Sequence, residues 1–296
     1  MESTQLPRKN ATEWLSQGKY FEFEKQQIFY IRDGRGTNLF LLHGYPTCSW
    51  DYSKIFSGLI RYYNVSVLDM LGFGYTAKPK KFPYSIHKQA DLVEAYLDKQ
   101  AIKRVRFVFH DYSVSIGQEL LARYKERGEK SPYKIDGVLF LNGGLFPQLH
   151  RPTRMQKLLS IPFLGGILIR FLTEEKFGKA LSEVFGSKTK PSERDIGSWF
   201  KLVQYPGKVK ISHKLLHYIK DRKVHQERWK DALDSKDVSL HFLLGEDDPV
   251  SGQHVSEYLR SNQKEHWTLQ TLPVGHYPQW ESPEAVYQAI RERFPT

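Results

Sequence analysis

The chain has 296 residues, of which 40% are hydrophobic and 26% charged, and it contains a single cysteine, Cys48. These values are ordinary for a globular protein, so they exclude low-complexity disorder, a collagen-like fibre and a disulfide-stabilised scaffold. The formal net charge is +11, but the densest basic runs, such as Lys220, Arg222 and Lys223, match no nucleic-acid-binding motif, so we expect a solvated basic surface and no nucleic-acid partner.

Residues 1–144 alternate short apolar runs with helical patterns. The expected strands lie at residues 21–24, 28–31, 39–42, 64–68, 105–109 and 137–141. The expected helices between the later strands lie at residues 86–97 and 114–123. Continuous apolar runs are typical of strands that are buried on both faces, and the alternation of strand with helix predicts a mostly parallel α/β sheet.

The alternation stops after Gly143-Gly144, where a helical insertion is expected. Residues 145–235 contain only helical patterns interrupted by prolines, and strands resume at residues 239–244 and 266–272. An insertion of this kind divides the sheet-forming part of the chain in two. The predicted segments are a first core part at residues 1–144, a helical cap (lid) domain at residues 145–235 and a second core part at residues 236–296.

The sequence shows neither a secretory signal nor an apolar run long enough to span a membrane. The first ten residues lack the apolar core of a secretory signal. The longest uncharged apolar run in the middle of the chain, residues 161–169, is too short to cross a bilayer. We therefore expect no membrane span and a cytoplasmic location.

Three of the predicted strands end in residues that can carry chemistry. The strand at 105–109 leads to Asp111, and the last two strands lead to Asp248 and His276. Because ligands and catalytic groups gather beyond the carboxyl ends of parallel strands, we expect these side chains to meet. The order of nucleophile, acid and histidine is that of α/β-hydrolases, in which the nucleophile lies on a sharp turn between a strand and a helix.

Each of these residues also has a simpler interpretation when it is taken alone. Asp111 could cap the following helix, which is a common role for aspartate. Asp248 could be a turn residue, with Asp247 as the acid in its place. His276, one of 11 histidines in the chain, could be a solvated loop residue. The joint pattern favours the catalytic interpretation over these alternatives.

Five motifs at the expected strand ends carry a resemblance to a known superfamily. They are His43-Gly44-Tyr45-Pro46, Asp69-Met70-Leu71-Gly72-Phe73-Gly74, His110-Asp111-Tyr112, Gly245-x-x-Asp248 and Gly275-His276. With them the sequence resembles the α/β-hydrolase superfamily over nearly its whole length, and within it the aspartate-nucleophile branch of epoxide hydrolases and haloalkane dehalogenases. Around the elbow and the cap it resembles the epoxide-hydrolase-like mesoderm-specific transcript proteins of animals. The residues concerned are His110-Asp111-Tyr112, Asn142-Gly143-Gly144, His150-Arg151-Pro152 and Arg228-Trp229.

The resemblance implies a two-step reaction without a metal or organic cofactor. Asp111, already ionised at neutral pH, would attack an sp³ carbon and form an alkyl ester. His276, oriented by Asp248, would then activate a water molecule that hydrolyses the ester. The backbone N–H groups of Tyr45 and Tyr112 would hold the oxyanion that forms.

Ser115 is the alternative nucleophile, because Ser113-Val114-Ser115-Ile116-Gly117 fits the small-x-Ser-x-Gly pattern of serine esterases. An elbow nucleophile follows its strand almost at once, whereas Ser115 comes six residues after Phe109. We therefore expect Ser115 to be a polar residue within the helix. Two departures from the superfamily pattern lie nearby: Phe109 replaces a small residue, and Ser113 replaces a glycine.

The choice between the two chemistries depends on the groups that stabilise the leaving group. A dehalogenase holds its halide with indole or amide N–H groups, whereas this chain has Tyr112 and Tyr45 at the corresponding places. Epoxide hydrolases protonate the alkoxide with lid tyrosines. The cap offers Tyr205 and Tyr218, of which Tyr218 matches the place of one family tyrosine, and His150 stands near the place of the other.

The sequence thus predicts an epoxide hydrolase that acts on an apolar epoxide. A haloalkane or haloacid dehalogenase is the enzyme alternative, and a catalytically retired hydrolase that serves as a binding protein is the non-enzyme alternative. Asp111→Asn separates the enzyme interpretations from the non-enzyme one, because it would abolish turnover by either enzyme but leave a binding role intact. The oligomeric state, including a homodimer, stays open.

Overall fold

The structure is a computed structural model that describes residues 10–161, 164–206 and 211–296. Its centre is an eight-stranded sheet in the order β1-β2-β4-β3-β5-β6-β7-β8. The strands are β1 (Lys19–Phe23), β2 (Gln26–Asp33), β3 (Asn38–Leu42), β4 (Asn64–Leu68), β5 (Arg104–Phe109), β6 (Lys134–Phe140), β7 (Leu240–Gly245) and β8 (Trp267–Leu272). The expected strands are all present, so the predicted α/β fold is confirmed.

The sheet is parallel except at one edge. β1 pairs antiparallel with β2, β2 pairs antiparallel with β4, and the remaining pairs are parallel. Leu42 at the end of β3 lies opposite Leu68 of β4 and Phe109 of β5. This register brings the loops that follow β3, β4 and β5 to the same edge of the sheet.

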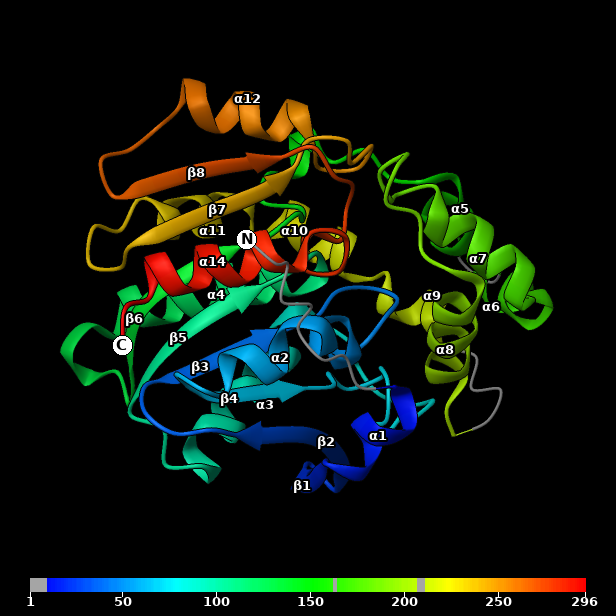
Figure 1. The fold of residues 1–296 in the computed structure, drawn as a ribbon, viewed down its shortest axis with the longest axis horizontal. Coiled ribbons are helices and arrows are strands. Elements are labelled where there is room, and N and C mark those ends of the chain that lie inside the picture. Colours follow the sequence, from blue (N-terminus) through cyan, green and yellow to red (C-terminus); the bar gives the residue numbers. More distant parts are fainter. Residues whose placement is uncertain (1–9, 162–163, 207–210) are drawn as a thin grey trace, which may run out of the picture.

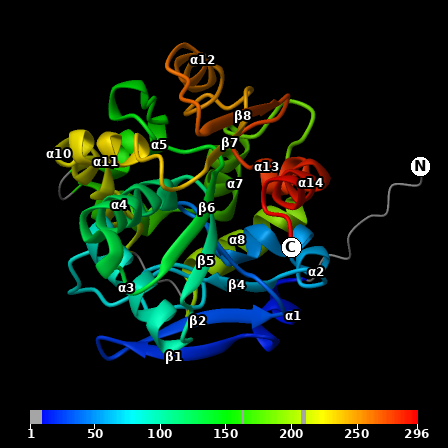
Figure 2. The same ribbon diagram turned by 90° about the vertical axis from the view of Figure 1, so that its left-hand side faces the viewer.

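Helices cover both faces of the sheet (Figure 2). One face packs against α3 (Ile86–Lys99), α4 (Tyr112–Arg127), α11 (Gln226–Leu233) and α12 (Gln253–Ser261). The other packs against α1 (Ala11–Ser16), α2 (Ser53–Leu59), α13 (Pro278–Glu281) and α14 (Pro283–Arg293). Successive side chains of a strand point to opposite faces, so Phe40 and Leu42 of β3 join the first core, while Leu39 and Leu41 join the second.

Helices are the regular elements of the described part of the insertion between β6 and β7. Its elements are η3 (Pro147–Leu149), α5 (Arg154–Leu159), α6 (Leu164–Leu168), η4 (Ile169–Phe171), α7 (Glu174–Ser182), α8 (Glu193–Gln204), α9 (Ser212–Leu215), α10 (Tyr218–Val224) and α11. Helices α5 to α9 lie beyond the carboxyl ends of the parallel strands (Figure 1). The chain then returns to the core, because α11 packs against α4.

Two short 3₁₀ helices complete the described elements, η1 (Ser49–Tyr52) before α2 and η2 (Gly128–Lys130) after α4. η1 contacts the cap, since Trp199 of α8 donates a hydrogen bond from Nε1 to Asp51 Oδ1 at 2.9 Å. In the part of the chain that the structure describes, no helix combines the length and apolar character needed to cross a membrane.

Candidate active site

Asp111 occupies a sharp turn between β5 and α4. Its backbone has φ +48° and ψ −107°, a conformation that is costly for a residue with a side chain and that must be held by its surroundings. The N–H of Asp111 donates to the Asn142 carbonyl at 2.7 Å. Ser113 Oγ accepts from the His110 N–H at 2.9 Å and lies 2.8 Å from the Leu42 carbonyl, to which it can donate. Ser113, which replaces the usual glycine, therefore ties the turn to the end of β3.

Two glycines allow the close packing around this turn. A Cβ at Gly44 would lie 2.6 Å from the Cβ of Asp111, so only glycine lets the loop after β3 approach the nucleophile candidate. A Cβ at Gly117 of α4 would lie 2.5 Å from the ring of Phe109. The bulky Phe109, a departure from the superfamily pattern, is thus accommodated by the absence of a side chain at position 117.

The structure brings together the three residues expected from the strand ends. Asp111 Oδ2 accepts a hydrogen bond from the Tyr45 N–H at 2.9 Å, and Asp111 Oδ1 lies 3.6 Å from His276 Nε2. His276 Nδ1 lies 2.7 Å from Asp248 Oδ2. All three side chains are buried. The imidazole therefore lies between two carboxylates, with its two nitrogens facing one each.

Asp248 rather than Asp247 faces the histidine. Asp248 accepts hydrogen bonds from the N–H groups of Val250 at 2.8 Å and Ser251 at 3.0 Å, whereas Asp247 is exposed. Asn142 Nδ2 also donates to Asp248 Oδ2, at 3.0 Å. Sequence reasoning cited Asn142 only as part of a motif and gave it no such role, although its place directly after the strand at 137–141 was a usable signal.

The charges in the site oppose the effect of burial. Burial alone would raise the pKa of Asp111, but the hydrogen bond and charge of His276, with smaller contributions from His110 and Arg222, hold it well below its usual value. Burial would lower the pKa of His276, but Asp248 and Asp111 raise it well above its usual value. An ionised Asp111 beside a protonated His276 is therefore the favoured state of the unliganded site at neutral pH.

Three side chains around Asp111 have buried polar atoms without a hydrogen-bond partner among the described residues. They are the hydroxyls of Tyr218 and Tyr112 and both ring nitrogens of His150. The ring of Tyr218, the first residue of α10, meets that of Tyr112 edge-on at 4.9 Å. Burial raises the pKa of Tyr218, and the Asp111 carboxylate adds to that effect. Such groups can donate hydrogen bonds to a substrate atom held near Asp111.

His150 and Tyr205, the other lid candidates, have different surroundings. His150 follows η3 and is partly buried. Burial lowers its pKa to about 4, and the positive charge of Arg222 acts in the same direction, so its ring is neutral at physiological pH. Tyr205 packs against Tyr75, with ring centroids 5.0 Å apart, and is 36% exposed. His150 interacts electrostatically with Asp111.

A pocket lies between the core and the cap. On the core side it is lined by Tyr45 and His276, and on the cap side mainly by aliphatic and aromatic side chains, including Leu159, Ile169 and Phe177. A lining of this apolar character suits small apolar ligands. In the described residues no group of three or more His, Cys, Asp or Glu side chains could hold a metal ion.

Arg222 is the functional candidate that sequence reasoning missed. It belongs to the run of basic residues that was expected to be solvated, and for Arg222 this expectation is wrong, because its side chain is only 2% exposed. Arg222 Nε donates to Ser115 Oγ at 2.7 Å, and the guanidinium lies 4.4 Å from the centroid of the Tyr218 ring. The available signal was its spacing from Tyr218, since residues four apart share a helix face. Ser115 lies within α4, as expected, but as a hydrogen-bond acceptor.

Comparisons with known proteins agree with this architecture. A sequence profile described as the alpha/beta hydrolase family matches residues 39–289. The human mesoderm-specific transcript homolog protein (Homo sapiens) is 37% identical over 281 residues, which cover 91% of this chain and 83% of that protein. The structure of the epoxide hydrolase CorEH is similar with a TM-score of 0.77 at 17% identity, over 94% of this chain and 98% of that chain. The haloalkane dehalogenase DatA from Agrobacterium tumefaciens C58 gives 0.75 at 19% identity, over 93% and 95% of the two chains.

Proposed function

The chain belongs to the alpha/beta hydrolase family, and on this premise we propose that it is an epoxide hydrolase that converts an apolar epoxide to a vicinal diol through a covalent ester on Asp111. One observation carries the proposal. The Asp111 carboxylate is positioned between the Tyr45 N–H and the His276–Asp248 pair, while the buried Tyr218 hydroxyl near it has no partner among the described residues.

In the first step, Asp111 Oδ1 attacks an epoxide carbon. A bond forms between this oxygen and the carbon, the carbon–oxygen bond of the ring breaks, and the ring oxygen leaves with the bonding electrons. The oxygen takes a proton from the Tyr218 hydroxyl, and His150 is the second hydrogen-bond donor. Epoxide opening needs such an acid because an unprotonated alkoxide is a poor leaving group.

In the second step, water hydrolyses the ester. Formation of the ester removes the negative charge of Asp111, which is one of the two causes that keep His276 protonated. His276 can then return its proton, by way of the site, to the Tyr218 phenolate and accept one from the attacking water, while Asp248 stabilises the charged ring. The oxyanion on the Asp111 carbonyl would be held by the N–H groups of Tyr45 and Tyr112. The ester bond then breaks and His276 passes the first water proton to the departing diol oxygen. The second water proton leaves the regenerated Asp111 carboxyl and protonates His276 again.

The indole groups of the chain argue against a halide as the leaving group. The chain has six tryptophans, and the indole N–H groups of four of them donate to protein partners elsewhere. These four are Trp14 with Ser49, Trp199 with Asp51, Trp229 with Glu119 and Trp267 with the Leu233 carbonyl. Neither Tyr45 nor Tyr112, at the places where a dehalogenase carries its halide donors, supplies an N–H from its side chain.

The test is a single turnover in ¹⁸O-labelled water with a panel of alkyl- and aryl-substituted epoxides. Mass spectrometry of the peptide that contains Asp111 should then detect ¹⁸O in the carboxylate, because the water oxygen enters at the ester carbonyl. Label in the diol alone would indicate direct attack by water and refute the ester on Asp111. A parallel panel of chloro- and bromoalkanes tests the dehalogenase alternative by halide release.

A further inference from the structure

Arg222 is a buried cation without an ion pair in the part of the chain that the structure describes. Its Nε donates to Ser115 Oγ at 2.7 Å and its Nη2 to the Asp111 carbonyl at 3.4 Å, while Nη1 has no hydrogen-bond partner among the described residues. A buried charge without a counterion costs several kcal/mol, so it is expected only where its field has a use or a ligand completes it. The guanidinium thus contacts both the backbone carbonyl of Asp111 and the ring of Tyr218.

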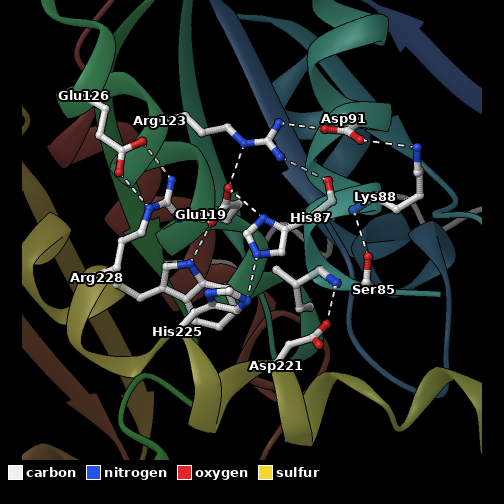
Figure 3. Close-up of polar contacts among 12 residues, drawn as sticks. Ser85, His87, Lys88, Asp91, Glu119, Arg123, Glu126, Asp221, His225 and Arg228 are labelled. Atoms are coloured by element: carbon white, nitrogen blue, oxygen red, sulfur yellow. Dashed lines mark hydrogen bonds and ion pairs between the residues drawn. The ribbon is translucent and has the colours of Figure 1, made fainter. Parts of the chain in front are cut away.

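The helix that carries both residues is firmly attached to the core (Figure 3). Asp221 Oδ2 accepts a hydrogen bond from the N–H of Ile86 in α3 at 2.9 Å. At the end of α10, His225 Nε2 lies 3.0 Å from His87 Nε2, and His87 Nδ1 lies 3.0 Å from the buried Glu119 of α4. Asp221 thus faces α3, and Arg222, the next residue, faces the site. The position of the guanidinium is therefore set by the docking of α10 on α3 and α4.

We propose that Arg222 is a positioning residue for the ring-opening step. Its guanidinium packs on the ring of Tyr218 and so fixes the position of the phenol. It also supplies a fixed positive charge while negative charge moves from Asp111 to the Tyr218 oxygen. This proposal rests on the epoxide hydrolase function proposed above. When the ester forms, the charge of Asp111 disappears and a negative charge develops on the epoxide oxygen and, after proton transfer, on the phenol. A fixed cation that hydrogen-bonds the Asp111 backbone carbonyl and lies over the Tyr218 ring stabilises the charge along this path without moving, which is the property of preorganised electrostatic catalysis.

The groups that face Tyr218 show why such a cation is needed. Its neighbours are the Asp111 carboxylate, the phenols of Tyr112 and Tyr45, and Arg222 on its own helix. Burial and the Asp111 charge both raise the pKa of Tyr218, whereas Arg222 lowers it. Without Arg222, a phenol in these surroundings would be a weaker acid at the moment when it must protonate the alkoxide.

The kinetic test separates the two chemical steps by rapid mixing and quenching. In Arg222→Met, we expect formation of the ester on Asp111 to slow about 10- to 100-fold, as for the loss of part of a general-acid contribution, while hydrolysis of the ester changes by less than a factor of about three. Arg222→Lys, which retains the charge, should recover part of the lost rate. Equal slowing of both steps, or no recovery by lysine, would overturn the proposal.

Lys223→Met is the matched control, because it also removes a cation from α10. Lys223 follows Arg222 directly and its side chain is exposed. We expect this variant to leave the rates of both steps unchanged. Arg222→Gln, a second neutral variant, replaces the methionine variant if that one does not fold.

A second measurement does not depend on turnover. Difluorotyrosine, whose phenol is intrinsically more acidic, is placed at position 218, and its ionisation is followed by ¹⁹F NMR as a function of pH. We expect the pKa to rise by about one unit or more when Arg222 is replaced by Met or Gln, and an unchanged pKa would refute the electrostatic role. If no epoxide is turned over by the wild type, the proposed function fails, whereas the titration still decides whether Arg222 acts on Tyr218.

Discussion

Asp51 provides the sharpest prediction for the contact between core and cap. Its carboxylate is fully buried, accepts hydrogen bonds from Thr47 Oγ1 at 2.5 Å and from Trp199 Nε1 of the cap, and lies in the field of Asp69 and Asp111. Burial raises its pKa from the usual 3.8 to about 8, although the two hydrogen bonds act in the opposite direction. The folded protein therefore retains a proton at position 51 that the unfolded chain has already lost.

The direction of the pH dependence follows from this difference in proton binding. Between about pH 4 and pH 8 the unfolded state binds fewer protons at Asp51 than the folded state, so the free energy of unfolding falls as the pH rises. The loss is about 1.4 kcal/mol per pH unit, which gives an upper limit of about 6 kcal/mol over the interval between 3.8 and about 8. Above about pH 8 both states are ionised and the loss stays constant.

The perturbation is Asp51→Asn, which is neutral at every pH. Its amide oxygen can accept from Trp199, and its NH₂ group can donate to Thr47. Urea unfolding of both proteins from pH 5 to pH 9 should show the variant gaining stability relative to the wild type as the pH rises to about 8. Asp98→Asn, at an exposed position on α3, is the control and should show no such gain. A difference between wild type and Asp51→Asn that stays constant over this range would refute the argument.

Three further predictions concern the reaction. The His276→Gln variant should form the ester but hydrolyse it at least about 10³-fold more slowly. Intact-protein mass spectrometry should therefore detect an adduct of substrate mass. An adduct-free protein would contradict the role of His276. The Tyr218→Phe variant should slow ring opening about 10²- to 10⁴-fold. Its melting temperature should change little, because the hydroxyl has no hydrogen-bond partner among the described residues. Normal activity would point to His150 as the acid. Gly44→Ala should abolish ester formation, because its Cβ would lie 2.6 Å from that of Asp111; a labelled Asp111 in this variant would contradict the close approach.

The strands were the most predictable part of the fold. The apolar run at 64–68 coincides with β4, and the runs at 39–42 and 105–109 are each extended by one residue in β3 and β5, because strands buried on both faces have to be apolar throughout. Helix α1 had no such signal: it has six residues, and Trp14 is its one buried side chain. Its start depends on a capping box between Asn10 and Glu13, a local pattern without apolar periodicity.

The site was predictable where it depends on strand ends and hidden where it depends on helix packing. Asp111, Asp248 and His276 follow strands, so the parallel register alone predicts that they meet. Arg222 follows no strand, and its burial depends on how α10 docks on α4, which a run of basic residues in the sequence cannot reveal. The assignment of Asp248 over Asp247 likewise needed the turn that directs the first inward and the second to solvent.

The contact between Phe109 and Gly117 has a consequence for anyone who recombines this protein with its relatives. The aromatic ring at the end of β5 fills the space where a helix α4 with an alanine or larger residue at position 117 would place its own side chain. A chimera that combines this strand with a helix carrying a side chain at position 117 would have the collision. The reverse chimera, with a small residue at position 109 and this helix, would have a cavity there. Positions 109 and 117 should therefore be taken from the same parent. Recombination libraries that do so should contain more folded variants than libraries that place a crossover between the two positions.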